Sequence, residues 1–145
     1  MSMITENVAQ IRSRIAAAAR AAGRDPADIR LCAATKMNDS AAVREAIAAG
    51  VDCCGENRVQ ELVKKLDEHA YDGAPVHFIG ALQRNKVRQV VGQVDVIESV
   101  DRRELLADIN AEAAKRGIVQ DILLEVNAGG EKQKSGFLLK EFIRQ

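Results

Sequence analysis

One lysine stands where an amine could do covalent chemistry. Lys36 follows the apolar run LCAAT and ends a predicted buried strand over residues 29–36. In parallel α/β folds the functional site lies at the carboxyl ends of the strands. An amine that is desolvated at such an apolar edge loses its proton more readily, and the neutral amine attacks an aldehyde to give a Schiff base. The position also suits a lysine whose stem covers apolar surface while its ammonium stays in water.

The other predicted strand ends supply few groups of this kind. Glu56 is interpreted either as a carboxylate near the site or as a charge favoured by the dipole at a helix N-terminus. For His77, within a predicted strand, a hydrogen-bonded structural role is the favoured interpretation. The strand-end residues are Gly55, Glu56, Asn57, Gly80, Ser99, Asp101 and Asn127.

Motifs for nucleotides and metals are missing. Residues 128–135 end in Lys-Ser like a phosphate-binding loop, but that pattern needs glycines where the chain has Ala128 and Gln133. No GxGxxG follows the first predicted strand, which argues against a dinucleotide site. The 3 cysteines lack CxxC or Cys/His spacing, so they are predicted to be reduced, buried thiols of a cytoplasmic protein without a metal site.

The elements that position these groups alternate between helix and strand. An amphipathic helix over residues 1–23 comes first, and helices with one apolar face separate the strands that follow. This alternation predicts βαβ crossovers and a parallel sheet, and the apolar strands predict that both faces of the sheet are covered. Five strands could form a complete open sheet or part of a (β/α)8 barrel. The strands are predicted at residues 29–36, 51–55, 76–80, 94–100 and within 118–127.

Composition narrows the classes of protein and partner. A length of 145 residues is typical of one domain, here residues 1–145. The 21 basic and 21 acidic residues cancel, so charge gives no reason to expect nucleic acid or an anionic membrane as a partner. Aromatic residues make up only 3%, which argues against a base-stacking surface. No apolar run approaches the roughly 18 residues of a membrane span, and no secretory signal is visible.

Five segments occur together in an order and spacing that carry a family resemblance. They are LCAATK (31–36), GENRVQEL (55–62), HFIGALQRNKVR (77–88), IESVD (97–101) and KSGF (134–137). Together they resemble the pyridoxal phosphate homeostasis protein family, the alanine-racemase-like, fold-type III proteins that bind pyridoxal 5′-phosphate (PLP).

The resemblance implies a fold, a cofactor and a role. The fold is an α/β, (β/α)8 TIM-barrel type with an extra N-terminal helix, and this chain would supply about five of the eight βα units. PLP would be held as a Schiff base on Lys36, while Asn57, His77 and Gly80 match motif positions near the cofactor. The implied role is intracellular PLP homeostasis without established turnover, with PLP-dependent apo-enzymes as candidate recipients.

Two departures from the family pattern stand out. Many members have a second lysine two residues after the first, where this chain has Asn38. The family's phosphate-binding segments are expected beyond residue 145, so the chain is interpreted as the N-terminal portion of a barrel.

Two rival functions stay open. A PLP-dependent amino-acid racemase needs a second base, and the only tyrosine, Tyr71, lies in a predicted loop before the third strand. A cofactor-free α/β interaction module would use neither Lys36 nor PLP.

Overall fold

The computed structural model describes residues 2–143, which form two compact units. The first unit consists of residues 2–56 with 60–76, and the second of residues 57–59 with 77–143. No helix in the described range is both long and apolar enough to cross a membrane. The same residues contain no group of three or more His, Cys, Asp or Glu side chains that could hold a metal ion.

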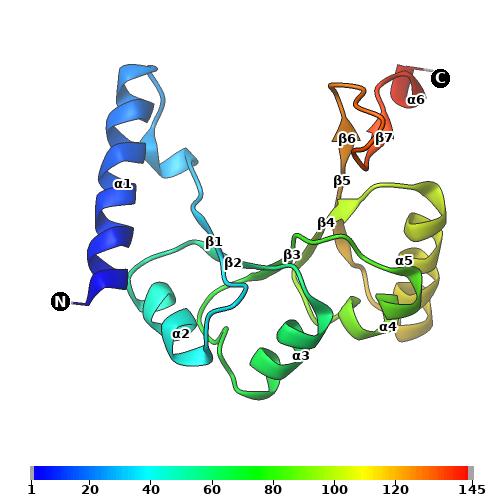
Figure 1. The fold of residues 1–145 in the computed structure, drawn as a ribbon, viewed down its shortest axis with the longest axis horizontal. Helices are drawn as coiled ribbons and strands as arrows, with labels where there is room; N and C mark the ends of the chain where they lie inside the picture. Colours follow the sequence, from blue (N-terminus) through cyan, green and yellow to red (C-terminus); the bar gives the residue numbers. More distant parts are fainter. Residues whose placement is uncertain (1, 144–145) are drawn as a thin grey trace. The chain divides into compact units, whose positions relative to one another are not determined.

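In the first unit a long helix precedes the strands (Figure 1). Ser2 caps the N-terminus of this helix by accepting a hydrogen bond from the N–H of Thr5. The helix itself packs against the second helix. That second helix is capped by Asp39, whose carboxylate accepts from the N–H of Ala42 at 2.8 Å, and not by the neighbouring Ser40. Ser40 is the first helical residue and donates its hydroxyl to Glu68 instead. The elements are α1 (Met3–Ala21), the 3-10 helix η1 (Pro26–Asp28), β1 (Cys32–Ala34), α2 (Ser40–Ala48), β2 (Cys53–Glu56), α3 (Val59–Asp67) and the start of β3 (Val76–Phe78).

The second unit continues the alternation of strand and helix. Its longest helix is capped at its C-terminus by Gly117, whose φ of 66° is the left-handed conformation that glycine adopts readily. Arg102 is the N-cap of this helix, and its guanidinium donates to the Asp101 carboxylate. The elements are η2 (Arg84–Lys86), α4 (Val87–Val90), β4 (Val96–Val100), α5 (Arg103–Arg116), β5 (Asp121–Leu124), β6 (Val126–Asn127), β7 (Phe137–Leu138) and α6 (Lys140–Ile143).

Five strands form one parallel sheet in the order β1-β2-β3-β4-β5. β1 pairs with β2 in the register Cys32↔Cys53, and β4 pairs with both β3 and β5. A doubly wound sheet would reverse its strand order at a switch point, whereas consecutive neighbours are the arrangement of a (β/α)8 barrel. The predicted parallel α/β fold of barrel type is confirmed. β6 and β7 form a separate two-stranded pair.

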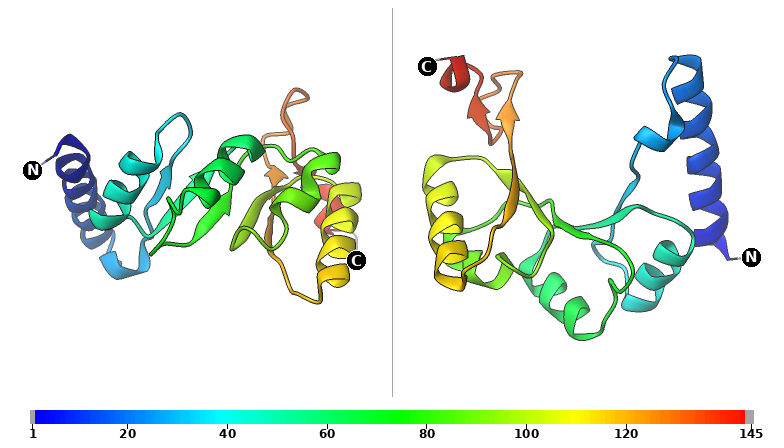
Figure 2. Two further views of the ribbon diagram at one scale, coloured as in Figure 1. Left: turned by 90° about the horizontal axis from the view of Figure 1, so that it is seen from below. Right: turned by 180° about the vertical axis from the view of Figure 1, so that it is seen from behind.

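Helices lie on one side of the strands within each unit. α2 and α3 lie on the same side of β1 and β2, and α4 and α5 pack together beside β4 (Figures 1 and 2). The fully buried side chains between these layers include Val43, Cys54 and Leu62 in the first unit and Phe78, Ile97 and Leu105 in the second.

Burial differs between the middle and the outer strands. All four residues of β2 are buried, but Cys32 and Ala34 of β1 are exposed, as are Leu123 and Leu124 of β5. The prediction that every strand is covered on both faces is therefore wrong for β1 and β5, because each is an end strand of the sheet order. The predicted buried state of the thiols likewise holds for Cys53 and Cys54 but is wrong for Cys32, which is exposed.

Candidate functional site

Lys36 lies in the turn that follows β1. Thr35 before it is buried, whereas Lys36 itself is exposed. The expectation that its amine is desolvated at an apolar edge is therefore wrong for the described chain. The position at the carboxyl end of a parallel strand is as predicted, and the exposed side chain leaves the amine open to a small aldehyde.

The turn around Lys36 has an uncommon backbone. Met37 has a φ of 60°, in the left-handed region that side chains disfavour. The side-chain amide of Asn38 donates to the carbonyl oxygen of Lys36 at 3.0 Å, and its backbone N–H donates to the carbonyl oxygen of Thr35 at 3.2 Å. Asn38, which stands where many family members have a lysine, thus closes the turn.

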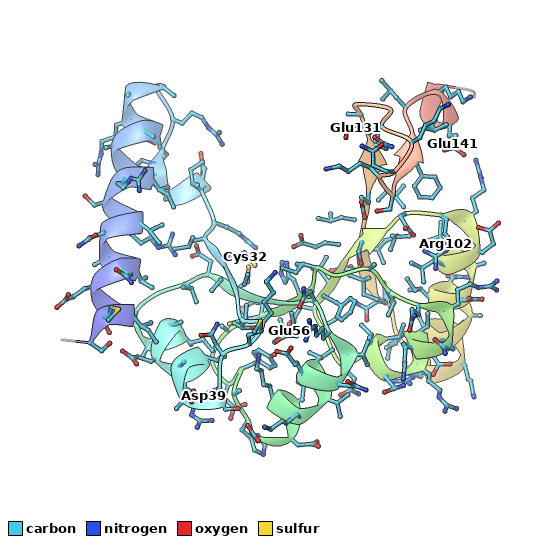
Figure 3. The ribbon with its side chains drawn as sticks, in the orientation of Figure 1. Cys32, Asp39, Glu56, Arg102, Glu131 and Glu141 are labelled. Carbon is cyan, nitrogen blue, oxygen red and sulfur yellow. The ribbon has the colours of Figure 1, made fainter. Side chains whose placement is uncertain are left out.

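Glu56 is the last residue of β2 and is fully buried (Figure 3). Its Oε2 accepts hydrogen bonds from the Lys65 ammonium at 2.7 Å, the Thr35 hydroxyl at 3.1 Å and the Tyr71 hydroxyl at 3.2 Å. The interpretation of Glu56 as a charge at a helix N-terminus is wrong, because it belongs to a strand. Its interpretation as a carboxylate near the site agrees with its contact to Thr35, the residue before Lys36, but this carboxylate is engaged in a buried ion pair. It therefore organises the end of β2 and is not an open acid or base.

Tyr71 takes part in the same cluster. Burial raises the pKa of its hydroxyl above the ordinary value, and the negative charge of Glu56 raises it further. The hydroxyl donates to Glu56 at 3.2 Å, so Tyr71 belongs to this buried cluster.

Asn57 and Gly80 are brought together in the second unit. A Cβ atom added to Gly80 would lie 2.3 Å from the carbonyl oxygen and 2.6 Å from the Cα atom of Asn57. Only a residue without a side chain permits this approach, so packing alone accounts for glycine at position 80.

His77 lies in β3 and binds a carboxylate of the neighbouring strand. Its Nδ1 is 2.6 Å from Oε1 of Glu98. His77 pairs with Val96 in the sheet register, so Glu98, two residues further along β4, faces the same side. The predicted hydrogen-bonded role of His77 is confirmed; its predicted place near a cofactor stays a prediction.

The remaining strand-end groups have mixed surroundings. Ser99 in β4 is buried, and its hydroxyl oxygen has no hydrogen-bond partner among the described residues. Asn127 donates its amide to the carbonyl oxygen of Glu131 at 2.8 Å, which shapes the loop before β7.

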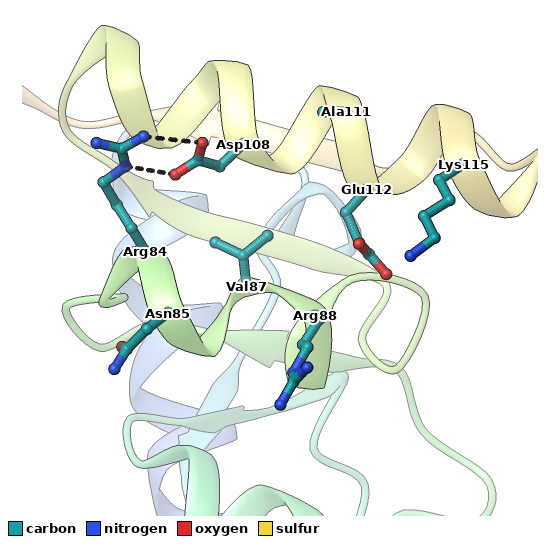
Figure 4. Close-up of a pocket in the computed structure, with 8 residues that line it drawn as sticks. All are labelled: Arg84, Asn85, Val87, Arg88, Asp108, Ala111, Glu112 and Lys115. Atoms are coloured by element: carbon teal, nitrogen blue, oxygen red, sulfur yellow. Dashed lines mark hydrogen bonds and ion pairs between the residues drawn. The ribbon is translucent and has the colours of Figure 1, made fainter.

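A cavity of about 530 Å³ lies between α5 and the η2–α4 segment (Figure 4). Arg84 forms a two-point ion pair there with Asp108, which lowers the pKa of the Asp108 carboxyl and raises the pKa of the Arg84 guanidinium. The cavity is lined by helices and not by strand ends, and Arg84, one of its basic groups, is already paired with Asp108. It is therefore a poorer candidate site than the turn at Lys36.

Two residues of α3 that the sequence interpretation passed over contact the Lys36 turn. The Lys65 ammonium donates to the carbonyl oxygen of Thr35 at 2.7 Å, and the Glu61 carboxylate accepts from the N–H of Met37 at 2.8 Å. One signal was present: Lys65 lies three residues after Leu62, on the apolar face that a helix buries.

Known proteins resemble the chain along nearly its whole length. The family model for the alanine racemase N-terminal domain matches residues 6–145. The pyridoxal phosphate homeostasis protein of Aquifex aeolicus is 41% identical over 131 residues, 90% of this chain and 58% of that protein. The protein of the same name from Pseudomonas aeruginosa is 42% identical over 136 residues, 94% of this chain and 59% of that protein.

The chain is also similar to a solved structure in both fold and sequence. PipY of Synechococcus elongatus, with PLP bound, has a TM-score of 0.75 and 32% identity, covering 93% of this chain and 58% of PipY. The chain thus spans about three fifths of the length of the relatives it matches.

Proposed function

The chain belongs to the family of the alanine racemase N-terminal domain, and from this premise we propose that it binds PLP through Lys36 and serves intracellular PLP homeostasis. One structural observation carries the proposal: an exposed lysine follows the first strand of a parallel, barrel-type sheet. The names of the relatives and the PLP in the PipY structure support it.

The residues present fit such a cofactor. Lys36 offers an exposed amine in a turn closed by Asn38, and this amine would hold PLP covalently as a Schiff base, with loss of one water. When bound, PLP supplies an aldehyde carbon that reacts with amines and a ring that withdraws electrons.

The other proposed cofactor residues rest on their motif positions. Asn57, His77 and Gly80 are proposed to help hold PLP. Glu98 fixes the His77 ring through its Nδ1, and the close approach of Asn57 to Gly80 fixes the backbone there. Rigid groups of this kind are suited to binding a planar ligand without reorganisation.

We propose that the role is binding without turnover. The relatives carry the name of a homeostasis protein, and Tyr71 is held by Glu56 and is not free to act as a base. Delivery of PLP to apo-enzymes in the cytoplasm is the accompanying proposal. The rival racemase activity is tested by incubating the chain with PLP and L-alanine and measuring D-alanine; racemisation above the rate with free PLP would overturn the binding-only role.

Covalent labelling tests the proposal directly. The chain is mixed with PLP, reduced with borohydride and mapped by peptide mass spectrometry. We expect the pyridoxyl group on Lys36, and we expect Lys36→Ala to abolish both the label and the visible absorption band of the bound cofactor. Lys64→Ala, which removes an exposed lysine of α3, is the matched control and should behave like the parent.

The same experiment separates the rival functions. A label found mainly on Lys86 or Lys134 would show that the assignment of Lys36 is wrong. Absence of any cofactor absorption with the parent chain would favour a cofactor-free module.

A further inference from the structure

Two side chains of α3 bind the two peptide groups that flank Lys36. The Lys65 ammonium donates to the carbonyl oxygen of Thr35, at 2.7 Å, in the peptide group before Lys36. The Glu61 carboxylate accepts from the N–H of Met37, at 2.8 Å, in the peptide group after it. Residues 61 and 65 are four apart and therefore share one face of the helix, so a single helical turn holds both peptide groups.

These two side chains are themselves fixed. Lys65 Nζ lies 3.4 Å from Glu61 Oε2 and 2.7 Å from Oε2 of Glu56. With the Thr35 carbonyl, the ammonium has three acceptors, which matches its three N–H donors. Because the side chain of Lys65 is only 5% exposed and that of Glu56 is 0% exposed, the ammonium has no solvent alternative to these bonds.

The backbone at Met37 has a conformation that requires support from surrounding contacts. Met37 combines a φ of 60° with an exposure of 83% for the whole residue, so packing of its own side chain does not account for its left-handed conformation. Residues in disfavoured conformations persist only where surrounding contacts impose them. The hydrogen bond to Glu61 and the bond from the Asn38 amide to the Lys36 carbonyl, at 3.0 Å, are contacts of this kind.

We propose that Glu61 and Lys65 are positioning residues that fix the backbone at Lys36 and thereby the place from which its amine reaches an aldehyde. The inference rests on the proposed function of Lys36 and deepens it. A lysine side chain is long and flexible, so the amine occupies a defined volume only if its Cα atom is held. Glu61 and Lys65 act through the backbone and take no part in bond formation.

The first test is hydrogen exchange of the Met37 amide. Glu61→Ala removes the acceptor of this N–H and should accelerate its exchange by about tenfold or more, the worth of one hydrogen bond to a charged group. Glu61→Gln keeps a side-chain oxygen acceptor and should retain most of the protection. Asp67→Ala, at an exposed position of the same helix, is the matched control and should leave the exchange rate unchanged.

The second test asks whether holding this backbone affects the reaction of the Lys36 amine with PLP. The ratio of pyridoxyl label on Lys36 to label on all other lysines is measured after borohydride reduction. Glu61→Ala should lower this ratio by about tenfold, and Glu61→Gln should restore it to within about threefold of the parent. A purely structural role would lower the stability without changing the ratio among folded molecules.

Each outcome decides one question. Exchange at Met37 within twofold of the parent in Glu61→Ala, or equally fast in Asp67→Ala, would show that Glu61 does not hold this backbone. Lost protection with an unchanged labelling ratio would show that holding the backbone does not position the amine. If the parent chain takes no label on Lys36, the proposed function fails, while the exchange rates still decide whether Glu61 holds the turn.

Discussion

Replacement of Lys65 by Met should destabilise the chain far more than the same replacement one residue earlier. The Lys65 ammonium donates to the Thr35 carbonyl and to the Glu56 carboxylate, both at 2.7 Å. Without it, the Glu56 carboxylate, which is 0% exposed, loses this charged donor and keeps the neutral hydroxyl donors of Thr35 and Tyr71. Removal of one partner of a buried ion pair typically costs about 3–5 kcal/mol, mainly because the other charge is left buried.

The matched control is Lys64→Met. Lys64 has the same side chain on the same helix but is 74% exposed, with its amine 3.8 Å from Glu68. Such exposed pairs contribute at most about 1 kcal/mol. The expected difference between the two variants is therefore about 3 kcal/mol in the free energy of unfolding.

A double substitution separates the charge from the packing. In Glu56→Gln with Lys65→Met, the neutral amide replaces the buried carboxylate and still accepts from Thr35. The penalty of an unpaired buried charge is gone, so the double variant should recover at least about 1.5 kcal/mol relative to Lys65→Met alone.

Urea unfolding measures these differences. The chain has 1 tyrosine and no tryptophan, so tyrosine fluorescence reports the surroundings of Tyr71 inside this cluster. A difference of about 3 kcal/mol should also separate the Tm values by roughly 6–12 °C. The reasoning is refuted if Lys65→Met falls within 1 kcal/mol of Lys64→Met, or if the double variant is less stable than Lys65→Met.

Three further predictions follow from individual contacts. Gly80→Ala should destabilise by about 1–3 kcal/mol in urea unfolding, because its Cβ atom would lie 2.3 Å from the Asn57 carbonyl oxygen, whereas Gly129→Ala, with no atom nearer than 3.7 Å, should be neutral. In the native chain iodoacetamide should alkylate the exposed Cys32 and spare Cys54, whose pKa is raised to about 11 by burial and by the neighbouring Cys53; equal labelling in mass spectrometry would contradict this. Burial works to raise the pKa of Asp52, but the Leu31 N–H and the Arg12 guanidinium outweigh it and lower that pKa. The folded value thus lies below the unfolded one, so the contribution is present above about pH 4 and is lost as pH falls through the folded value. Asp52→Asn should therefore make the free energy of unfolding less steeply pH-dependent between about pH 4 and 2. An unchanged pH dependence in this range would contradict the lowered pKa of Asp52.

The sequence by itself determined the order of elements and the place of Lys36. Short apolar runs that alternate with amphipathic helices indicate βα units. The strands of consecutive units pair as neighbours when each crossover is short. A lysine directly after such a run therefore falls at the carboxyl end of a parallel strand wherever the exact boundary lies, and β1 ends two residues before Lys36.

The exposure of the end strands and the identity of the helix-capping residue depend on the folded structure. The residues of β1 and β5 are as apolar as those of β2, so sequence alone suggests equal burial; exposure depends on having a neighbour on one side only. Asp39 and Ser40 are both good capping residues. The backbone of Asp39 is extended, with ψ at 169°, and Ser40 already lies in the helix, which settles the cap.

The cluster around Lys36 could be seen only in the tertiary structure. Glu56, Glu61 and Lys65 are charged residues of a kind that usually lies in solvent. Apart from the place of Lys65 on the apolar face of its helix, nothing in their spacing shows that Glu56 and Lys65 are buried together. Their burial depends on the packing of α3 against the end of β2, which brings one ammonium within 2.7 Å of both a carboxylate and the Thr35 carbonyl. Local sequence sets the chemical types of these groups, but the interactions join residues 9 to 30 positions apart, and such distances are closed only by the fold.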